Sequence, residues 1–405
     1  MTLPKKLFCF FIVISFLLPI SINFGDTGNK PIDIVFSDFL LLFFIYFILK
    51  IDKKDLYSPL SFFVFINFFY AGILSFYFFI ISGGNYISII SYLKLYKIFL
   101  FFFIGMSVAS TPYLRTYFIK NIYKFSAFIV LIIFFSTLFD SRFPMLRWGE
   151  SFFDIETYGF PNSFTTFLSI LIVLMLYRYL TQKDYRYLIL YYLGLPIVIF
   201  SLSRSSLIVL CCSSIFLFYF YTINKISQRI KLLFSFILIA IVFFCLLNQL
   251  SDDNEISKIV DVSYERLSRT LGQREDFSSG RTEMWGRTFE LIFDKPVFGY
   301  CFQPFSSHNF GYDTPHNQYL ELLYKTGIIG LILFSGFFLL IIKLINKMEY
   351  SLKYLYFSLL IGLFIGSFTQ PNFTFSLTGN FLFFLSGFFL IDAKNEKYET
   401  IITES

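Results

Sequence analysis

Long apolar runs recur along the whole chain and alternate with short polar stretches. A helix that crosses a bilayer needs roughly 20 mostly apolar residues, because hydrocarbon offers no partner to an unpaired backbone N–H or C=O group. The runs that approach this requirement are 7–23, 33–49, 59–82, 90–111, 125–140, 161–178, 187–203, 205–223, 232–250, 327–345, 354–371 and 376–391. The pattern therefore predicts an all-α integral membrane protein with about 12 transmembrane helices.

The first run follows Lys5 and Lys6, an arrangement that a secretory signal peptide also shows. The residues after it, Ser21 to Gly25, show no small-x-small cleavage pattern. We therefore interpret this run as a transmembrane helix.

Basic residues fall mainly on one side of these runs. If both termini are cytoplasmic, the inner segments hold 19 of the 33 Lys and Arg residues, and the short outer connections and helix ends hold six. Cytoplasmic segments carry the excess of Lys and Arg, so the count predicts two cytoplasmic termini. The chain then divides into helices 1–9 (residues 1–250), a large periplasmic loop (251–326), helices 10–12 (327–391) and a cytoplasmic tail (392–405).

Composition removes several other classes of protein. Hydrophobic residues make up 56% of the chain and charged residues only 15%, whereas soluble domains carry about 25% charged residues. The basic residues form small clusters between apolar runs, which excludes the concentrated basic surface of a nucleic-acid-binding protein. The five cysteines show neither metal-ligand spacing nor a disulfide framework.

The long loop contains a predicted helix that begins after Ser279, a plausible N-cap, and ends near Pro296. Arg287 lies about 240° around this helix from Arg281, on a more polar face. The stripe shared with Arg281 consists of Met284, Trp285, Thr288 and Ile292. If this stripe lies along the membrane surface, Arg281 is held at the depth of a lipid phosphate. The alternative is an interfacial helix with a snorkelling arginine.

A second helix is predicted to start at Thr314 as N-cap, with Pro315 as its first helical residue. His316 would then lie in the first turn, where free N–H groups and the positive end of the helix dipole favour a neutral imidazole and a bound anion. This interpretation makes His316 a candidate catalytic residue. His308, in a polar stretch, is interpreted as structural.

Arg204 lies in a short hinge, Ser201 to Ser206, between two apolar runs. A charge so close to hydrocarbon is costly and is usually retained for a partner, which favours a functional Arg204; the alternative is an arginine that merely anchors the helix pair at the outer interface. Asp38 and Asp140 are weaker candidates, because each could only cap a helix or face water.

Five motifs follow one another in order: the Ser-Arg-Ser hinge, Gly280-Arg281-x-x-x-Trp285, Pro296-x-x-Gly299, His316-Asn317-x-Tyr319-Leu320, and Gly-Ile-Ile-Gly at 327–330. Over about residues 200–335 this arrangement resembles the bacterial O-antigen ligase and O-antigen polymerase superfamily. The resemblance implies a GT-C-like membrane glycosyltransferase in the bacterial inner membrane, with its active site facing the periplasm. Such an enzyme moves a glycan from an undecaprenyl-diphosphate-linked donor to a hydroxyl of a glycan or lipid A–core acceptor, with no cofactor and no metal.

The resemblance also suggests roles for the candidate residues. The planar guanidinium group of arginine binds phosphate oxygens in a bidentate geometry. Arg204 and Arg281, with Arg287 as a weaker third, are therefore assigned to the diphosphate. His316 would act as the base or bind the diphosphate, and Arg281 would take part in catalysis. An acidic base remains open, and its candidates are Glu283, Glu290, Asp313 and Glu321.

Several partners and alternatives follow. Partners are the lipid-linked donor, the acceptor, membrane lipids, and chain-length regulator and flippase proteins; nucleic acid is not expected.

The form Ser279-Gly-Arg-x-x-x-Trp285 favours a polymerase over a ligase. A polysaccharide flippase or other transporter is the alternative of another class, but it would place charges deep inside its helices. Here they are expected at helix ends, although Lys94 and Lys97 lie near the fourth run. A non-catalytic scaffold would not explain why Arg204, Arg281 and His316 share one side.

Overall fold

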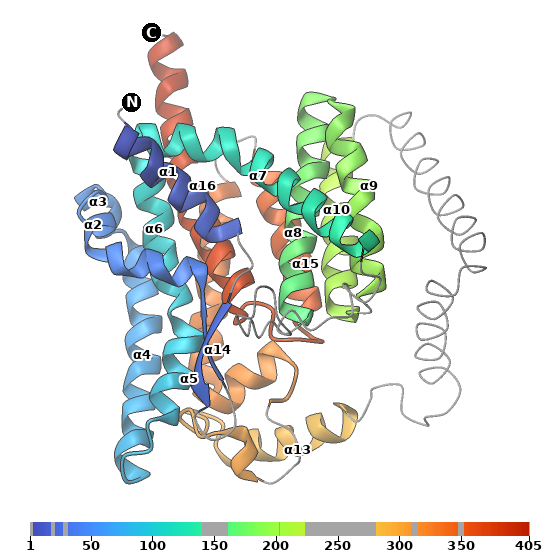
Figure 1. Ribbon diagram of the computed structural model, residues 1–405. Helices are drawn as coiled ribbons and strands as arrows, with labels where there is room; N and C mark the ends of the chain where they lie inside the picture. Colours follow the sequence, from blue (N-terminus) through green and yellow to red (C-terminus); the bar gives the residue numbers. More distant parts are fainter. Residues whose placement is uncertain are drawn as a thin grey trace, which may run out of the picture.

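A computed structural model describes residues 3–17, 21–26, 31–139, 161–201, 203–222, 281–308, 314–346 and 352–404 (Figure 1). The α-helices are α1 (Leu3–Leu17), α2 (Phe44–Ile48), α3 (Lys53–Leu56), α4 (Pro59–Ile81), α5 (Ile87–Tyr96), α6 (Ile98–Ser110), α7 (Pro112–Phe139), α8 (Pro161–Gln182), α9 (Tyr185–Phe200), α10 (Arg204–Thr222), α13 (Arg281–Asp294), α14 (Gln318–Asn346), α15 (Lys353–Gly366) and α16 (Ser376–Glu404). Two 3-10 helices, η1 (Phe36–Phe43) and η2 (Phe305–His308), and two strands, β1 (Ser21–Asp26) and β2 (Pro31–Val35), complete the described elements.

The described residues contain 6 helical segments long and apolar enough to cross a membrane. They are Pro59–Ile81, Ile87–Ser110, Pro112–Phe135, Ser163–Gln182, Arg204–Tyr221 and Gln318–Asn346. The chain is therefore a polytopic membrane protein, as the apolar runs predicted. The predicted run 232–250 lies outside the described residues.

The N-terminal region differs from the prediction of two simple spans. Strands β1 and β2 form an antiparallel hairpin in which Ser21 is opposite Val35 and Asn23 is opposite Asp33. Helix α1 ends at Leu17, and the second predicted span, 33–49, begins in β2 and continues as the 3-10 helix η1 and the short helix α2. Polar residues at 23, 26 and 33 make this stretch a poor bilayer helix, so the expectation of an all-α chain is wrong for these residues.

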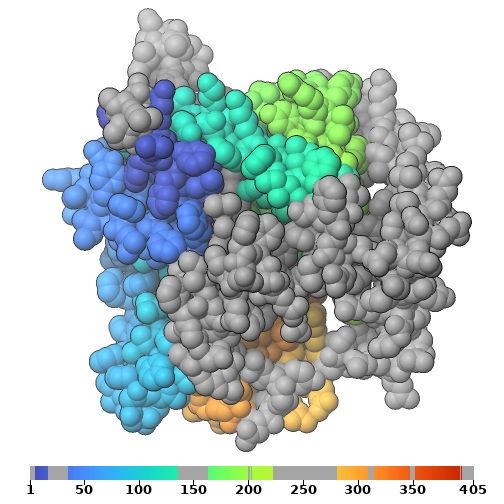
Figure 2. Space-filling model, in the orientation of Figure 1, coloured from blue at the N-terminus to red at the C-terminus, as the bar shows by residue number. Residues whose placement is uncertain are grey.

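The two ends of the helix bundle are unlike each other. Both chain termini lie at one end, together with the connections from α3 to α4 and from α8 to α9 (Figure 1). Helix α13 and the start of α14 lie at the opposite end. In the space-filling view, α1 and α7 cover the terminal end, whereas α13 emerges at the other end (Figure 2). The two ends are therefore built from different parts of the sequence.

Helices α6 and α16 pack with very close backbones. A Cβ atom at Gly105 would lie 2.0 Å from the carbonyl oxygen of Phe384, and one at Gly387 would lie 1.9 Å from that of Phe102. Neither position can hold a larger residue without separating the helices, which is how small residues act in membrane helix pairs. Nearly all residues of α6 and of the first part of α16 are buried, so this contact lies inside the protein.

Buried charges in this part of the bundle are paired. Lys97 separates α5 from α6, in the middle of the Ile87–Ser110 span, and its ammonium group forms an ion pair with Asp38. The side-chain amide of Asn380 donates to the other Asp38 oxygen at 2.9 Å. The expectation that charges stay at helix ends is therefore wrong for Lys97. Asp140 lies outside the described residues.

Candidate active site

The connection between α15 and α16, residues 367–375, is an irregular segment that reaches into the bundle. Helix α15 has 14 residues, a rise of roughly 21 Å, which is shorter than the hydrocarbon core of roughly 30 Å. Irregular backbone at such depth is tolerated only where protein covers it. Asn372 and Phe373 are indeed fully buried. The sequence interpretation missed this segment, because it continued the helix through residue 371.

This connection is the point at which three other elements meet. A guanidinium nitrogen of Arg281 on α13 donates to the carbonyl oxygen of Thr369 at 3.1 Å. The side-chain amide of Asn317 donates to the carbonyl oxygen of Phe368 at 3.1 Å. Ser205 on α10 donates to Asn372 Oδ1 at 2.9 Å. Segments that are far apart in the sequence are thus joined at one place.

Arg204 and Arg281 approach each other at this junction. Arg204 is the first residue of α10 and is exposed, and Arg281 is the first residue of α13 and is partly buried. Burial, and then the positive charge of Arg204, lower the pKa of the Arg281 guanidinium. A cation at a helix N-terminus also opposes the helix dipole. Because the starts of α10 and α13 both contact the connection 367–375, they form a region that favours an anion.

A network of hydroxyl groups fixes the start of α10. The hydroxyl of Ser206 lies 2.7 Å from that of Thr165 and 3.0 Å from that of Thr166, both on α8. Ser203 adds a contact of 2.7 Å to the same hydroxyl. This network explains why the hinge before α10 is rich in serine, and it holds Arg204 in place.

The predicted stripe on α13 is confirmed, but it faces protein. Met284, Thr288 and Ile292 are buried, and Met284 packs with Tyr324 of α14. The indole nitrogen of Trp285 donates to the carbonyl oxygen of Pro315 at 2.9 Å. The expectation that this stripe could lie along the membrane surface is therefore wrong, because the start of α14 and the segment before it cover it.

Arg287 lies on the other face of α13. Its side chain is 46% exposed, and its guanidinium group donates to Glu283 Oε1 at 2.5 Å. The structure brings Arg204 and Arg281 together, whereas Arg287 points away from Arg281, as the helical spacing indicated.

The end of α13 is fixed to α14 by two interlocked glycines. Gly299 and Gly327 both have φ of 64°, a conformation that favours glycine. A Cβ at Gly327 would lie 2.1 Å from the carbonyl oxygen of Val297, and one at Gly299 would lie 2.5 Å from that of Tyr324. The kink at Gly327 also leaves the Tyr324 carbonyl able to accept the N–H of Tyr300 at 2.6 Å. These contacts explain both glycine motifs of the sequence.

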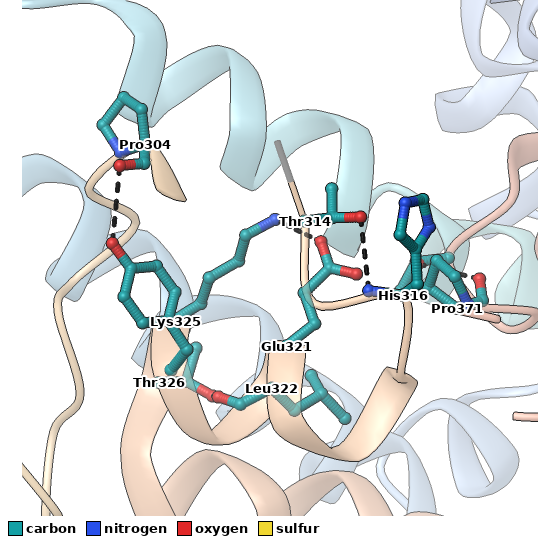
Figure 3. Close-up of polar contacts among 10 residues, drawn as sticks. Pro304, Thr314, His316, Glu321, Leu322, Lys325, Thr326 and Pro371 are labelled. Atoms are coloured by element: carbon teal, nitrogen blue, oxygen red, sulfur yellow. Dashed lines mark hydrogen bonds and ion pairs between the residues drawn. The ribbon is translucent and has the colours of Figure 1, made fainter. Parts of the chain in front are cut away.

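His316 precedes α14 and does not lie in its first turn. Asn317 is the residue that caps the helix, since its Oδ1 accepts the N–H groups of Tyr319 at 2.9 Å and Leu320 at 3.2 Å. Thr314 instead accepts the N–H of His316 at 3.4 Å, in a turn where His316 has φ of 47° (Figure 3). The predicted Thr314 cap is thus wrong.

The start of α14 offers less to an anion than predicted. Asn317 occupies two of its N–H groups, and the N–H of Gln318 donates to the carbonyl oxygen of Ser367 at 3.0 Å. The expectation that free N–H groups would bind the diphosphate here is therefore wrong. The arginines remain the candidate ligands for an anion.

The second histidine has a different setting. His308 Nε2 lies 3.0 Å from the hydroxyl of Tyr324, and burial, followed by the charge of Lys295, lowers the pKa of His308. This contact supports the structural interpretation of His308. Among the residues that the structure describes, no three His, Cys, Asp or Glu side chains come together as they would around a metal ion.

Comparison with known families adds one finding. Residues 189–335 match the profile of the family described as O-antigen ligase (Wzy_C). The matched range includes Arg204, Arg281, Arg287 and His316, as well as both interlocked glycines. A search of curated proteins gives no significant match.

Proposed function

Since residues 189–335 form a domain of the O-antigen ligase family within a polytopic membrane protein, we propose that the chain is a surface-polysaccharide polymerase. It transfers a glycan from undecaprenyl diphosphate to a hydroxyl group of a second lipid-linked glycan. The matched domain supports the glycosyltransferase class, and the form Ser279-Gly-Arg-x-x-x-Trp285 favours the polymerase within it. The name of the matched family favours the second candidate, a ligase that uses lipid A–core as the acceptor.

The observation that carries this proposal is the approach of Arg204 and Arg281. Burial and the neighbouring arginine both disfavour the positive charge of Arg281, and the negative charge of a bound anion offsets both effects. A lipid diphosphate is such an anion, and guanidinium groups bind phosphate oxygens in a bidentate geometry. In this proposal the pair holds the diphosphate of the donor and stabilises it as it leaves.

The bonds, electrons and protons of the proposed transfer balance. The oxygen of the acceptor hydroxyl bonds to the anomeric carbon, and the bond from that carbon to the diphosphate oxygen breaks. The electron pair leaves with the diphosphate, and the hydroxyl proton passes to a base. His316 is the proposed base, with binding of the diphosphate as its alternative role, because it lies in the turn between the Trp285 contact and Asn317. No metal or other cofactor takes part in the proposed transfer.

The proposed topology has twelve transmembrane helices, cytoplasmic termini, and the site at the periplasmic face of the bacterial inner membrane. Two features support it: both termini lie at the end of the bundle opposite α13 (Figure 1), and the segments that would then be cytoplasmic hold 19 of the 33 Lys and Arg residues. The excess of basic residues at one end is what the cytoplasmic side of a membrane protein shows. A flippase and a chain-length regulator are the expected neighbours of such an enzyme.

The surface polysaccharide of a deletion strain tests this function. We expect lipid A–core that carries a single repeat unit, and restoration of the full ladder on a gel by the wild-type gene. Loss of all polysaccharide from the core, with lipid-linked polymer accumulating, would instead identify the ligase. An unchanged surface glycan would contradict both, and repeat units retained on the cytoplasmic side would indicate a flippase.

Two variants in the same strain test the site. Arg281→Ala and His316→Asn should fail to restore the ladder while reaching wild-type abundance in the membrane. Asparagine is chosen at 316 because it tolerates the left-handed conformation found there. A normal ladder from both variants would show that these residues do not form the active site.

A further inference from the structure

The first segment of α14, before the kink at Gly327, carries polar side chains on one face. Gln318, Glu321 and Lys325 are three and four residues apart and therefore share that face. Gln318 is 0% exposed and Glu321 is 5% exposed. Buried amide and carboxylate groups are costly in a membrane protein unless they are fully hydrogen-bonded.

The hydrogen bonds of this face are incomplete. Lys325 Nζ donates to Glu321 Oε1 at 2.6 Å (Figure 3), which leaves the second carboxylate oxygen on the side of the turn formed by Thr314 and His316. That oxygen, Oε2, has no hydrogen-bond partner among the described residues, and neither do Nε2 and Oε1 of Gln318. Three atoms on one helix face thus have hydrogen-bonding capacity that no described residue uses.

The connection between α15 and α16 adds two more such atoms. Ser367 Oγ and Asn372 Nδ2 are buried and have no partner among the described residues. The N–H of Gln318 donates to the carbonyl oxygen of Ser367 at 3.0 Å. Asn372 lies close to the residue before Ser367, since its Nδ2 atom would be 2.7 Å from a Cβ atom placed on Gly366. We refer to Gln318, Glu321, Ser367 and Asn372 as the polar cluster.

The polar cluster differs in charge from the arginine pair beside it. Lys325 balances Glu321, so the cluster has no excess charge, and its unused atoms include donors (amide N–H and hydroxyl) and acceptors (amide and carboxylate oxygens). Sugar hydroxyls both donate and accept hydrogen bonds, and they match this set, whereas an anion matches only the donors. The chemistry therefore fits an uncharged, hydroxyl-rich group.

We propose that the polar cluster binds hydroxyl groups of the acceptor sugar, beside the diphosphate held by Arg204 and Arg281. This proposal rests on the proposed function. Transfer requires the acceptor hydroxyl to lie roughly 3–3.5 Å from the anomeric carbon, so the two sites must adjoin. The same connection meets both sites, since Thr369 accepts from Arg281 and Ser367 accepts from Gln318.

Gln318→Met separates this role from a structural one. Replacing a buried amide that has no partner by an apolar side chain of similar shape is neutral or stabilising for a fold. If Gln318 only fills space, the variant should be at least as stable and fully active. If Gln318 binds a sugar hydroxyl, the variant should remain stable and bind the acceptor poorly.

The experiment uses the full-length protein in lipid nanodiscs. A labelled undecaprenyl-diphosphate-linked repeat unit, extracted from the deletion strain, serves as donor, and increasing amounts of the same unit on a short-chain lipid serve as acceptor. We expect Gln318→Met and Glu321→Gln to raise the KM for the acceptor about 10-fold or more. Binding of the donor and the thermal unfolding midpoint of Gln318→Met should not fall. Gln182→Met is the matched control, because Gln182 is exposed at the end of α8.

Two results would overturn the proposal. A wild-type KM for the acceptor in Gln318→Met, in a preparation whose wild type transfers glycan, would show that the cluster is structural and leave the proposed function intact. A wild-type protein that transfers no glycan, in nanodiscs where it is folded, would contradict the proposed function and the acceptor site with it.

Discussion

The charged and polar groups in the two parts of the bundle are satisfied in different ways. Around η1, α6 and α16, Lys97 forms an ion pair with Asp38, and Asn380 adds a hydrogen bond to the same carboxylate. Where α13 and α14 meet the connection between α15 and α16, burial and then the positive charge of Arg204 lower the pKa of Arg281, and neither side-chain polar atom of Gln318 has a partner among the described residues.

The difference indicates where selection for stability ends and selection for binding begins. A buried ion pair with an internal partner holds helices in register and needs nothing else. Like charges side by side, and buried amides that have no partner, lower stability and are retained where a ligand completes them. The contrast predicts that substitutions at Lys97 should act through stability, and substitutions at Arg281 through catalysis.

Lys97→Met should have the largest effect on stability. It leaves Asp38, whose side chain is 9% exposed, as a buried carboxylate without its cation, which typically costs about 3–5 kcal/mol. We expect a lower thermal unfolding midpoint in detergent and less protein in the membrane. Arg186→Met is the matched control, because its pair with Asp184 is much more exposed, at 85% for the arginine and 23% for the aspartate, so its loss should change stability far less.

The double variant Asp38→Asn/Lys97→Met distinguishes the pair from its surroundings. Removing both charges should recover most of the lost stability, since no uncompensated charge remains. A double variant as unstable as Lys97→Met would show that the ion pair is not the cause. A stable double variant without transferase activity would contradict the division between a stabilising and a catalytic region, because the region around Lys97 would then also take part in function.

Arg281→Lys should have the next largest effect, and on rate alone. Lysine keeps the charge but loses the planar fork that grips two phosphate oxygens, so transfer should fall about 100-fold with an unchanged unfolding midpoint. Arg287→Lys, on the exposed face beside Glu283, should lose much less. Arg186→Lys, paired with Asp184 at 2.8 Å between α8 and α9, is the matched control. Equal losses at 281 and 287 would make Arg287 a third ligand of the diphosphate.

The membrane helices could be predicted from the sequence because hydrocarbon imposes a strict demand on length and composition. The predicted runs 59–82 and 205–223 correspond to α4 and α10 within a few residues. The hairpin at 21–35 was missed because most of it lies in the connection between the predicted runs 7–23 and 33–49. The hydropathy pattern locates such a connection but does not show whether its two halves pair as strands.

The sequence predicted which residues belong to the candidate site better than it predicted how the local backbone positions them. The stripe on α13 follows from helical periodicity, and it placed Arg281 and Arg287 on different faces correctly. The cap of α14 was assigned to Thr314 because Pro315 commonly follows an N-cap. Asn317, however, satisfies two N–H groups, which Thr314 would not. The connection after α15 was missed because Thr369 to Asn372 form contacts with segments far away in the sequence, and local patterns carry no such information.

The smallest expected effect is a pH dependence of stability at one of the two histidines of the chain. His308 is bonded internally, to Tyr324, so it should behave like the ion-paired region and unlike His316. Burial and Lys295 lower its pKa in the folded protein, so the unfolded chain binds a proton more readily than the folded one. Its contribution to stability is therefore complete above pH about 6.5 and is lost as the pH falls through the lower folded pKa.

His308→Gln should remove this dependence. Between pH 7.5 and 5.5 the unfolding midpoint of the wild type should fall slightly more than that of the variant, while both transfer glycan at similar rates at pH 7.5. Shifts from all other groups are common to both proteins and cancel in the difference. An equal fall in both proteins would show that His308 is not the titrating group. A variant that is stable but inactive would place His308 in the active region, and the contrast between the two histidines would no longer hold.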